Sequence, residues 1–391
     1  MKVLLLNAGH NDLGLIRGLK KLGAQIVVTG KMPGLIGAKY CDKYIQADYS
    51  DMEKILEIAK EEHADRICPC CNDYGVYTAA YVAEKLGLPG HDSYETVCRL
   101  NHKDKFKKLA RELDLITPWS EAFTDTAQAE RFLKTVKYPV MVKPSDASAG
   151  NGAAKAENLE EACHAVSQAF GFSRKHAIVI EQYVSGSQHG FSTFLVREKV
   201  MAYCSNNEYS FVNPYRVEID TFPADGYEKA AEVLIPEIEK IAQTLHLKDG
   251  IFHLQYMLSD EKPQILEVMR RAVGNMYSVP ADQLTGISWD YWEARARCGM
   301  DCSDFPVPVR QHGYFAYKAV LGSRDGVIKR IEIPQDYDKY LFGQCMIKKP
   351  GDVIRDYKSD PAGFLFFMFQ SAEEMQRVLI EEYRCDLIQM E

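Results

Sequence analysis

The sequence predicts an α/β protein in which an N-terminal parallel sheet precedes a larger region of α+β structure. Over the first hundred residues, short apolar runs alternate with amphipathic helical periods, as in a small parallel sheet. Further along, residues 250–258 and 264–268 are two apolar runs joined by a polar turn, as in an antiparallel pair. The chain has 391 residues, which is enough for two or three domains at about 150 residues each.

Residues 1–100 form the first predicted domain. Residues 3–6 (VLLL) and 25–29 (QIVVT) have the composition of buried strands. Leucines recur at helical spacing between them, and Gly23 ends that helix. Because the alternation repeats up to residue 100, we expect a Rossmann-like parallel sheet.

This first domain lacks the fingerprint of a dinucleotide-binding fold. Gly9 and Gly14 do not complete a G-x-G-x-x-G motif, and the second strand ends in Thr29-Gly30-Lys31 rather than in an acidic residue for the ribose. Both departures argue against an NAD(P)-dependent oxidoreductase, an alternative that only the alternating pattern supports.

Composition and charge exclude several classes of partner. The net charge is -8, so no basic field favours nucleic acid. No apolar run approaches membrane-spanning length, and the first apolar run is too short for a signal peptide, so we expect no membrane partner. The eleven cysteines are scattered, which favours reduced thiols and a cytoplasmic location.

A lysine-rich amphipathic helix opens the second predicted domain. It covers about residues 102–113, and Pro118 prevents its continuation. Considered alone, such a helix presents its lysines to solvent.

Lys143 and the loop after it predict a phosphate site. Lys143 ends the apolar run 139–142, where an unpaired ammonium group is costly to bury. The following residues, 144–152 (PSDASAGNG), have small side chains that let backbone N–H groups approach phosphate oxygens. A β-hairpin turn with a solvent-directed lysine is the alternative.

Residues 177–180 (AIVI) predict another buried strand, and Glu181, Tyr183 and Val184 follow it. A linker between strands can present backbone groups to the edge of an adenine ring. We expect Glu181 to accept a hydrogen bond from the exocyclic amine and the Val184 backbone to bind a ring nitrogen. The alternative is an ordinary hairpin with a surface glutamate.

The antiparallel pair carries the polar residues that a cation requires. Strand alternation places His253, Gln255 and Met257 on one face, and the turn brings Glu267 next to Gln255. The stretch from Glu267 to Arg271 predicts a strand end that holds a cation and a charged ligand. A surface Glu–Arg pair on a hairpin is the alternative.

In this order, the motifs resemble the ATP-grasp superfamily and its carboxylate–amine ligases, such as L-amino acid ligases, phosphoribosylaminoimidazole carboxylase ATPases and carbamoyl-phosphate synthetase large chains. The resemblance implies a two-lobed grasp domain at 101–300, with a small nucleotide lobe at about 116–185, and a small α+β ligase-type domain at 301–391. It implies an ATP site made of the phosphate lysines Lys105 and Lys143, the loop residues Ser148 and Gly150, the adenine-binding Glu181, Tyr183 and Val184, and Gln188 at the ribose.

The resemblance also assigns the metal and substrate ends of the site. Gln255 and Glu267 correspond to ligands of Mg²⁺ or Mn²⁺. Met269 stands where the family usually has asparagine, and a thioether is a poor ligand for Mg²⁺. Arg271 corresponds to an arginine that, with Lys143, stabilises the transferring phosphoryl group. The residues expected to border the substrate are His253, Arg270 and Asn275.

The activity implied by the resemblance is ATP-dependent ligation. ATP activates a small-molecule carboxylate as an acyl phosphate, and an amine then displaces phosphate, so a carboxylate and an amine are the expected partners. Members of the family are often homodimers, so a homodimer is the expected assembly. An ATP-binding protein with weak or no turnover is the alternative, because Met269 replaces a metal ligand and Gln188 replaces a common glutamate.

Overall fold

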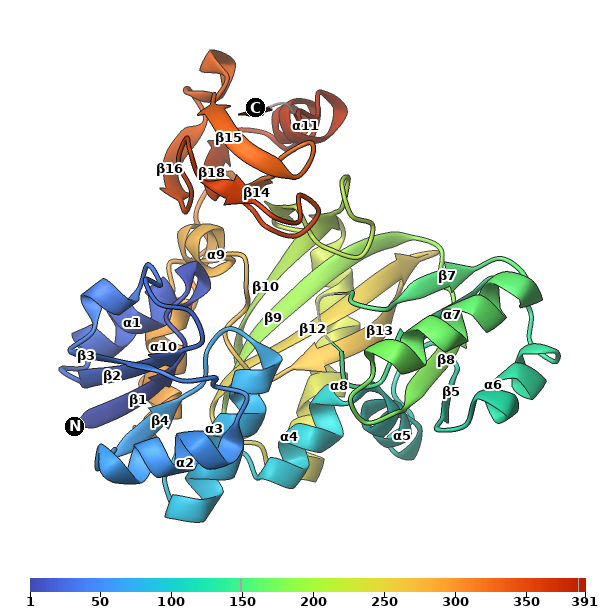
Figure 1. The fold of residues 1–391 in the computed structure, drawn as a ribbon, viewed down its shortest axis with the longest axis horizontal. Coiled ribbons are helices and arrows are strands. Elements are labelled where there is room, and N and C mark those ends of the chain that lie inside the picture. Colours follow the sequence, from blue (N-terminus) through green and yellow to red (C-terminus); the bar gives the residue numbers. More distant parts are fainter. Residues whose placement is uncertain (148–149, 386) are drawn as a thin grey trace.

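The structure of the chain is a computed structural model that describes residues 1–147, 150–385 and 387–391. A large antiparallel sheet lies at its centre (Figure 1). In the view of Figure 1, the N-terminal parallel sheet lies to the left of it, a smaller lobe to the right, and the C-terminal strands at the top. This mixed α/β architecture confirms the predicted fold class.

The N-terminal sheet is parallel, with strand order β3-β2-β1-β4. Its central strands consist of buried aliphatic residues, as expected for a sheet covered on both faces. Its strands are β1 (Lys2–Leu6), β2 (Gln25–Gly30), β3 (Lys43–Gln46) and β4 (Arg66–Cys68), and the helices of this region are α1 (Leu13–Lys21), α2 (Met52–Glu61), α3 (Asp73–Leu86) and α4 (Tyr94–Asn101).

A helix from much later in the chain completes the N-terminal region. α10 (Trp289–Arg297) lies against α1 (Figure 1). The approach is so close that a Cβ atom at Gly14 or Gly18 would collide with Asp290. A domain boundary at residue 100 therefore leaves out part of the cover of this sheet.

The small lobe has the four-stranded sheet β5-β8-β6-β7, within the range expected for it. α6 and α7 share one hydrophobic core with this sheet. Its elements are β5 (Ser120–Phe123), α6 (Thr126–Leu133), β6 (Val140–Pro144), β7 (Ala154–Ala156), α7 (Leu159–Phe172) and β8 (Ile178–Gln182).

The central sheet has eight strands in the order β13-β12-β9-β10-β11-β14-β18-β16. α5 (Lys103–Glu112) and α8 (Tyr227–Leu245) pack on its outer face through a shared core. Its strands are β9 (Ser187–Val196), β10 (Lys199–Tyr209), β11 (Ile219–Phe222), β12 (Gly250–Ser259), β13 (Lys262–Met269), β14 (Tyr314–Val320), β16 (Leu341–Met346) and β18 (Gly363–Phe369).

The residues after 300 contribute to two sheets. Strands β14, β16 and β18 continue the central sheet. A second sheet in this region has the order β17-β15-β19. The remaining elements are α9 (Ser278–Thr285), β15 (Gly326–Ile331), β17 (Val353–Ile354), α11 (Ala372–Gln376), β19 (Ile388–Met390), the 3₁₀ helices η1 (His10–Asp12), η2 (Ala38–Tyr40) and η3 (Gln335–Tyr337), and the π-helical η4 (Arg377–Glu381).

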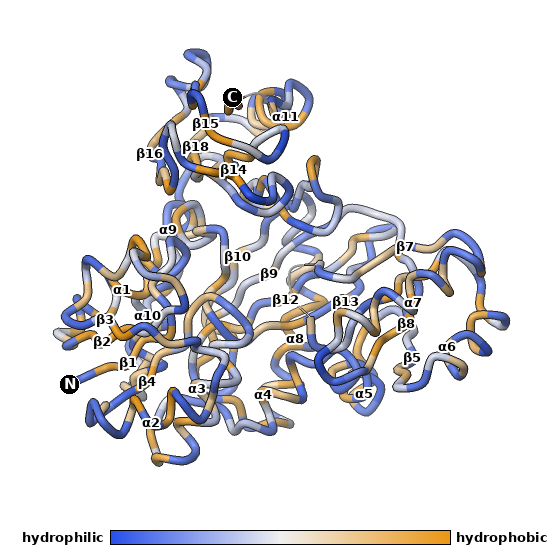
Figure 2. Tube along the Cα trace, viewed as in Figure 1, coloured by the Kyte–Doolittle hydropathy of each residue, from blue (hydrophilic) through white to orange (hydrophobic). Residues whose placement is uncertain are grey.

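Hydrophobic residues follow the inner strands. Figure 2 shows hydrophobic stretches along β1 and β4 and hydrophilic stretches in the outer loops. In the described part of the chain, no helix combines the length and the apolar character needed to cross a membrane.

Candidate functional site

Two cavities meet at the inner face of the central sheet. The lobe cavity, of about 300 Å³, lies between the small lobe and strands β12 and β13. The sheet cavity, of about 390 Å³, extends from there over β10, β11 and β14. The residues that line both are Gly150, Gln188, Tyr215, Gln255 and Glu267.

Lys103, and not Lys105, reaches the lobe cavity from α5. Its Nζ lies 3.1 Å from Glu267 Oε2 and donates a hydrogen bond to the Ala147 carbonyl at 2.9 Å. Lys105 is exposed and lines neither cavity. The prediction for Lys105 is therefore wrong, because helical spacing puts Lys103 and Lys107 on the inner face and Lys105 on the outer one.

Glu181 is held between two lysines. Its side chain is 2 % exposed; one carboxylate oxygen lies 3.1 Å from Lys107 Nζ, and the other pairs with Lys143 Nζ. Burial alone would raise the pKa of Glu181, but these two ammonium groups outweigh it and lower the pKa to about 2. This arrangement corrects the expectation of a carboxylate free to accept from adenine, because both oxygens already have cationic partners.

The chain after β8 forms one wall of the lobe cavity. Gln182, Tyr183 and Val184 line it, and Lys155 Nζ lies 4.1 Å from the centroid of the Tyr183 ring. The predicted small-residue loop forms another wall through Gly150. Gly150 has a φ of 71°, and a Cβ atom there would lie 2.4 Å from Tyr215 Cβ, so both conformation and space require glycine. Ser148 lies outside the described residues.

Gln255 and Glu267 stand opposite each other on β12 and β13, as the sequence predicts. Both line the two cavities. The positive charge of Lys103 is the main cause that lowers the pKa of Glu267, so this carboxylate is ionised at neutral pH.

The sequence prediction missed Glu208, a residue of β10 that lines the sheet cavity. Its Oε2 accepts hydrogen bonds from the side-chain amides of Gln188, at 2.6 Å, and of Gln255, at 2.7 Å. Because the nitrogen of each amide faces Glu208, the Gln255 carbonyl oxygen is left for another partner. Glu208 therefore orients both of the glutamines that the sequence had singled out.

Arg271 lines the sheet cavity beside Met269. Its guanidinium group pairs with Asp73 at 2.7 Å and donates a hydrogen bond to Met269 Sδ at 3.3 Å. Asp73 begins α3, so the N-terminal region orients this arginine.

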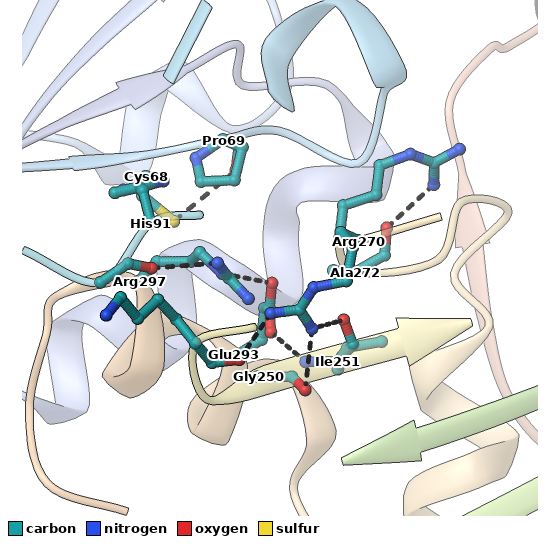
Figure 3. Close-up of polar contacts among 12 residues, drawn as sticks. Cys68, Pro69, His91, Gly250, Ile251, Arg270, Ala272, Glu293 and Arg297 are labelled. Carbon is teal, nitrogen blue, oxygen red and sulfur yellow. Dashed lines mark hydrogen bonds and ion pairs between the residues drawn. The ribbon is translucent and has the colours of Figure 1, made fainter. Parts of the chain in front are cut away.

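Arg270 does not face either cavity, and the expectation of a substrate contact is wrong. Its side chain is fully buried and pairs with Asp92 at 3.0 Å. It also donates hydrogen bonds to backbone carbonyls, including that of Ile251 at 2.5 Å, in a network beside Arg297 and Glu293 (Figure 3). Arg270 and Arg271 directly follow β13, and only Arg271 faces the sheet cavity.

The other two expected substrate residues do line the sheet cavity. His253 is buried, and its Nδ1 lies 2.7 Å from Ser192 Oγ. Burial, with a smaller effect of Arg271, lowers the pKa of His253 to about 3, so the ring is neutral at neutral pH. Asn275 donates hydrogen bonds to the Val217 carbonyl and the Tyr317 hydroxyl, both at 3.2 Å.

The residues present fit a hard divalent cation that keeps water or ligand oxygens. Glu267 offers one carboxylate, and Gln255 offers an amide oxygen from the adjacent strand. Within residues 1–147, 150–385 and 387–391, no three His, Cys, Asp or Glu side chains are placed to hold a metal by themselves. A nucleotide's phosphate oxygens would complete such a coordination sphere.

The chain is similar to known proteins in sequence and in fold. The family model for the phosphoribosylglycinamide synthetase ATP-grasp (A) domain matches residues 101–214. A phosphoribosylamine–glycine ligase of Pyrococcus furiosus is 26% identical over 371 residues, which cover 87% of this chain and 81% of that protein. The crystal structure of an L-amino acid ligase from Bacillus licheniformis has a TM-score of 0.81 at 18% identity, and the match covers 100% of this chain and 98% of that one.

Other relatives are much longer than the matched region. The N-terminal section of the carbamoyl phosphate synthase large chain of Methanopyrus kandleri is 26% identical over 179 residues, or 44% of this chain. The match spans 32% of that relative. This likeness therefore concerns a region of that relative rather than the complete protein.

Proposed function

We propose that the chain is an ATP-dependent, ADP-forming carboxylate–amine ligase of the ATP-grasp type, because an ATP-grasp domain model matches residues 101–214 and a 26% identical ligase covers 87% of the chain. One observation carries the proposal. Lys103, Glu267 and Gln255 meet where the lobe cavity opens into the sheet cavity, with Arg271 on the far side. A nucleotide in the first cavity would then direct its phosphates at a substrate in the second.

In this proposal the lobe cavity holds ATP. The backbone of residues 182–184 faces the adenine ring, in place of the Glu181 carboxylate expected from the sequence. Lys103 and Lys143 contact the phosphates, Gln188 contacts the ribose, and Ala147 and Gly150 border the phosphates. Two lysines already compensate the charge of Glu181, so the cavity wall keeps a net positive charge for the phosphates.

Gln255 and Glu267 would hold Mg²⁺, and Mn²⁺ accepts the same oxygen ligands. A bound metal would neutralise phosphate charge during transfer. Lys103, which pairs with Glu267 in this structure, supplies a positive charge at the same place.

The reaction has two steps. A carboxylate oxygen of the substrate attacks the γ-phosphorus of ATP, the bond to the bridging oxygen breaks, and ADP leaves. The amine then attacks the carbonyl of the acyl phosphate and loses a proton, while phosphate leaves and the amide forms. The chain contributes position and charge: Lys143 and Arg271 stabilise the phosphoryl oxygens, and neutral His253 borders the carboxylate.

The test of this function is ADP release. The protein is incubated with Mg-ATP and pools of carboxylates and amines, and ADP and phosphate are measured. The proposal expects substrate-dependent release of both. ATP binding without release in any pool would favour a binding protein without turnover, the alternative that Met269 and Gln188 motivate.

Substitution of Lys103 and Lys105 gives a matched pair of variants. We expect Lys103→Ala to lower kcat/KM for ATP about a hundredfold, because a charge beside the phosphates is lost. Lys105→Ala removes the same group from the exposed face and should leave kcat/KM within about twofold. Steady-state ADP release measures both, and equal effects would contradict the placement of Lys103.

Met269→Asn restores an oxygen ligand next to Glu267. We expect Mn²⁺ to bind about tenfold more tightly, a gain of about 1.4 kcal/mol, because an amide oxygen replaces a thioether. Titration of free Mn²⁺ by electron paramagnetic resonance measures the affinity. Unchanged affinity together with lower turnover would assign Met269 to the substrate cavity instead.

The compartment and the assembly also remain proposals. All eleven cysteines are free thiols, which supports a reducing cytoplasm. A homodimer is proposed from the superfamily resemblance, and sedimentation of the full chain would test it.

A further inference from the structure

The loop between β10 and β11 reaches from the central sheet to the small lobe. Its residue Tyr215 accepts a hydrogen bond through its hydroxyl oxygen from the backbone N–H of Lys155 in β7, at 3.0 Å. The backbone of Tyr215 also lies against Gly150, where a Cβ atom would come within 2.5 Å of the Tyr215 carbonyl oxygen. Tyr215 therefore contacts the small lobe at two points, one on β7 and one on the loop that precedes it.

Tyr215 lies where the lobe cavity meets the sheet cavity, and it lines both. The other described residues that line both cavities have a role in the proposed ligase. Gly150 borders the phosphates, and Gln188 contacts the ribose. Gln255 and Glu267 hold the metal. Tyr215 occupies the same junction, and its contacts indicate what it contributes there.

Lys155 links Tyr215 to the wall of the nucleotide cavity. β7 is the last strand in the order β5-β8-β6-β7, and the Lys155 N–H donates to Tyr215 rather than to another strand. The Lys155 ammonium group lies 4.1 Å from the centroid of the Tyr183 ring, and both side chains line the lobe cavity. The Tyr215 hydroxyl therefore holds a strand whose side chain forms part of the wall beside the proposed adenine position.

The same loop is anchored at the substrate end of the sheet cavity. Asn275 donates a hydrogen bond to the Val217 carbonyl at 3.2 Å. Arg216 donates one to the Ser359 carbonyl at 3.3 Å, and Ser359 also lines the sheet cavity. Because Arg216 and Val217 directly follow Tyr215, these contacts fix Tyr215 relative to the residues at the substrate end.

Phosphoryl transfer requires the nucleotide and the substrate carboxylate to be held in one geometry, and a displacement of about 1 Å can lower the rate about a hundredfold. In the proposed ligase the two ligands lie in different cavities, so the small lobe has to keep a fixed position over the central sheet. We propose that Tyr215 is a positioning residue for phosphoryl transfer, because its hydroxyl fixes β7 and the nucleotide wall relative to the loop at Asn275. The inference rests on the proposed ligase function.

Tyr215→Phe tests the hydroxyl alone, because the variant keeps the ring. The protein is used in excess over Mg-ATP, with the pool of carboxylates that releases the most ADP in the test above. We expect the rate constant of ADP formation in this single turnover to fall about fivefold, which corresponds to one hydrogen bond of about 1 kcal/mol. The affinity for ATP should stay within about twofold. A loss of folded protein would lower the amount of ADP formed but not its rate constant, so the measurement separates positioning from stability.

The control is Tyr40→Phe, which removes the same atom from a tyrosine of similar exposure. Tyr40 is 46% exposed and Tyr215 is 38% exposed. Tyr40 lines neither the lobe cavity nor the sheet cavity. The single-turnover rate constant of Tyr40→Phe should therefore match that of the unchanged protein.

Hydrogen exchange reports the contact itself and requires no turnover. The Lys155 N–H should exchange at least about threefold faster in Tyr215→Phe than in the unchanged protein, because its acceptor is lost. The measurement uses the full chain with a non-hydrolysable ATP analogue and follows residues 153–157 by mass spectrometry. Tyr40→Phe should leave this exchange rate unchanged.

The outcomes separate this inference from the proposed function. Faster exchange at Lys155 together with an unchanged rate constant in Tyr215→Phe would overturn the positioning role and leave the ligase intact. Unchanged exchange in Tyr215→Phe would overturn the contact on which the inference depends. Absence of ADP from the unchanged protein with every carboxylate would overturn the ligase and, with it, the positioning role, whatever the exchange at Lys155 shows.

Discussion

Glu267→Gln is expected to lower turnover by about a hundredfold to a thousandfold, while ATP still binds with reduced affinity. The substitution keeps the shape of the side chain and an oxygen atom but removes the charge. That charge faces Lys103 at 3.1 Å and is the only carboxylate proposed for the metal. A neutral amide would therefore weaken both the metal site and the position of Lys103.

Three measurements check this expectation: ADP release for kcat, Mn²⁺ titration for the metal and equilibrium dialysis for ATP. The control is Glu261→Gln in the turn of the same hairpin, where the glutamate is 78% exposed and pairs with exposed Lys229. Such surface pairs contribute little, so the control should behave as the unchanged protein does. Normal turnover in Glu267→Gln would mean that the metal assignment is wrong.

Strand periodicity accounts for the part of the site that the sequence predicted correctly. The alternation on residues 250–258 and the short turn after them place Gln255 opposite Glu267, and the structure has this pair. The partner of a hairpin strand is local in sequence, so its register follows from turn length and pattern alone. The small-residue loop was placed beside Lys143 for the same reason, since Lys143 and Gly150 are close in sequence, and both line the lobe cavity.

Errors arose where the orientation of a side chain depends on distant packing. The sequence of α5 offers Lys103, Lys105 and Lys107. The apolar residues Phe106, Leu109 and Ala110 face the protein interior. Lys107 is buried together with them. Helical phase was available from the sequence and would have favoured Lys103 over Lys105. The partner of Lys107, Glu181, lies 74 positions later and was not predictable from the helix.

Glu208 was missed for a related reason. It lies near the end of β10, where residues 204–209 (CSNNEY) have no clear alternation of apolar and polar residues. Its partners Gln188, Gln255 and Asp220 come from three other strands. Only the order of strands in the central sheet, which is non-local, brings these four side chains together.

Arg270→Met is expected to destabilise the protein by about 3–5 kcal/mol, since removal of one partner of a buried ion pair leaves the other charge uncompensated. Arg270 is fully buried, and its partner Asp92 is 2% exposed. The guanidinium group also donates hydrogen bonds to the carbonyl oxygens of Lys248, Gly250 and Ile251, and these carbonyls would lose their donors in the variant. The carbonyls belong to the start of β12 and the residues before it, so the network fixes the strand that carries Gln255.

Urea unfolding of Arg270→Met and of the unchanged protein measures the difference. The double variant Arg270→Met/Asp92→Asn removes the uncompensated charge of Asp92 and keeps an acceptor for the Lys248 N–H. It should therefore recover part of the lost stability. Arg330→Ala, at a 66% exposed arginine, should change stability by less than about 0.5 kcal/mol. If Arg270→Met were as stable as the unchanged protein but impaired in turnover, Arg270 would be a substrate residue after all. The buried position and the four polar contacts of its side chain argue for the opposite result.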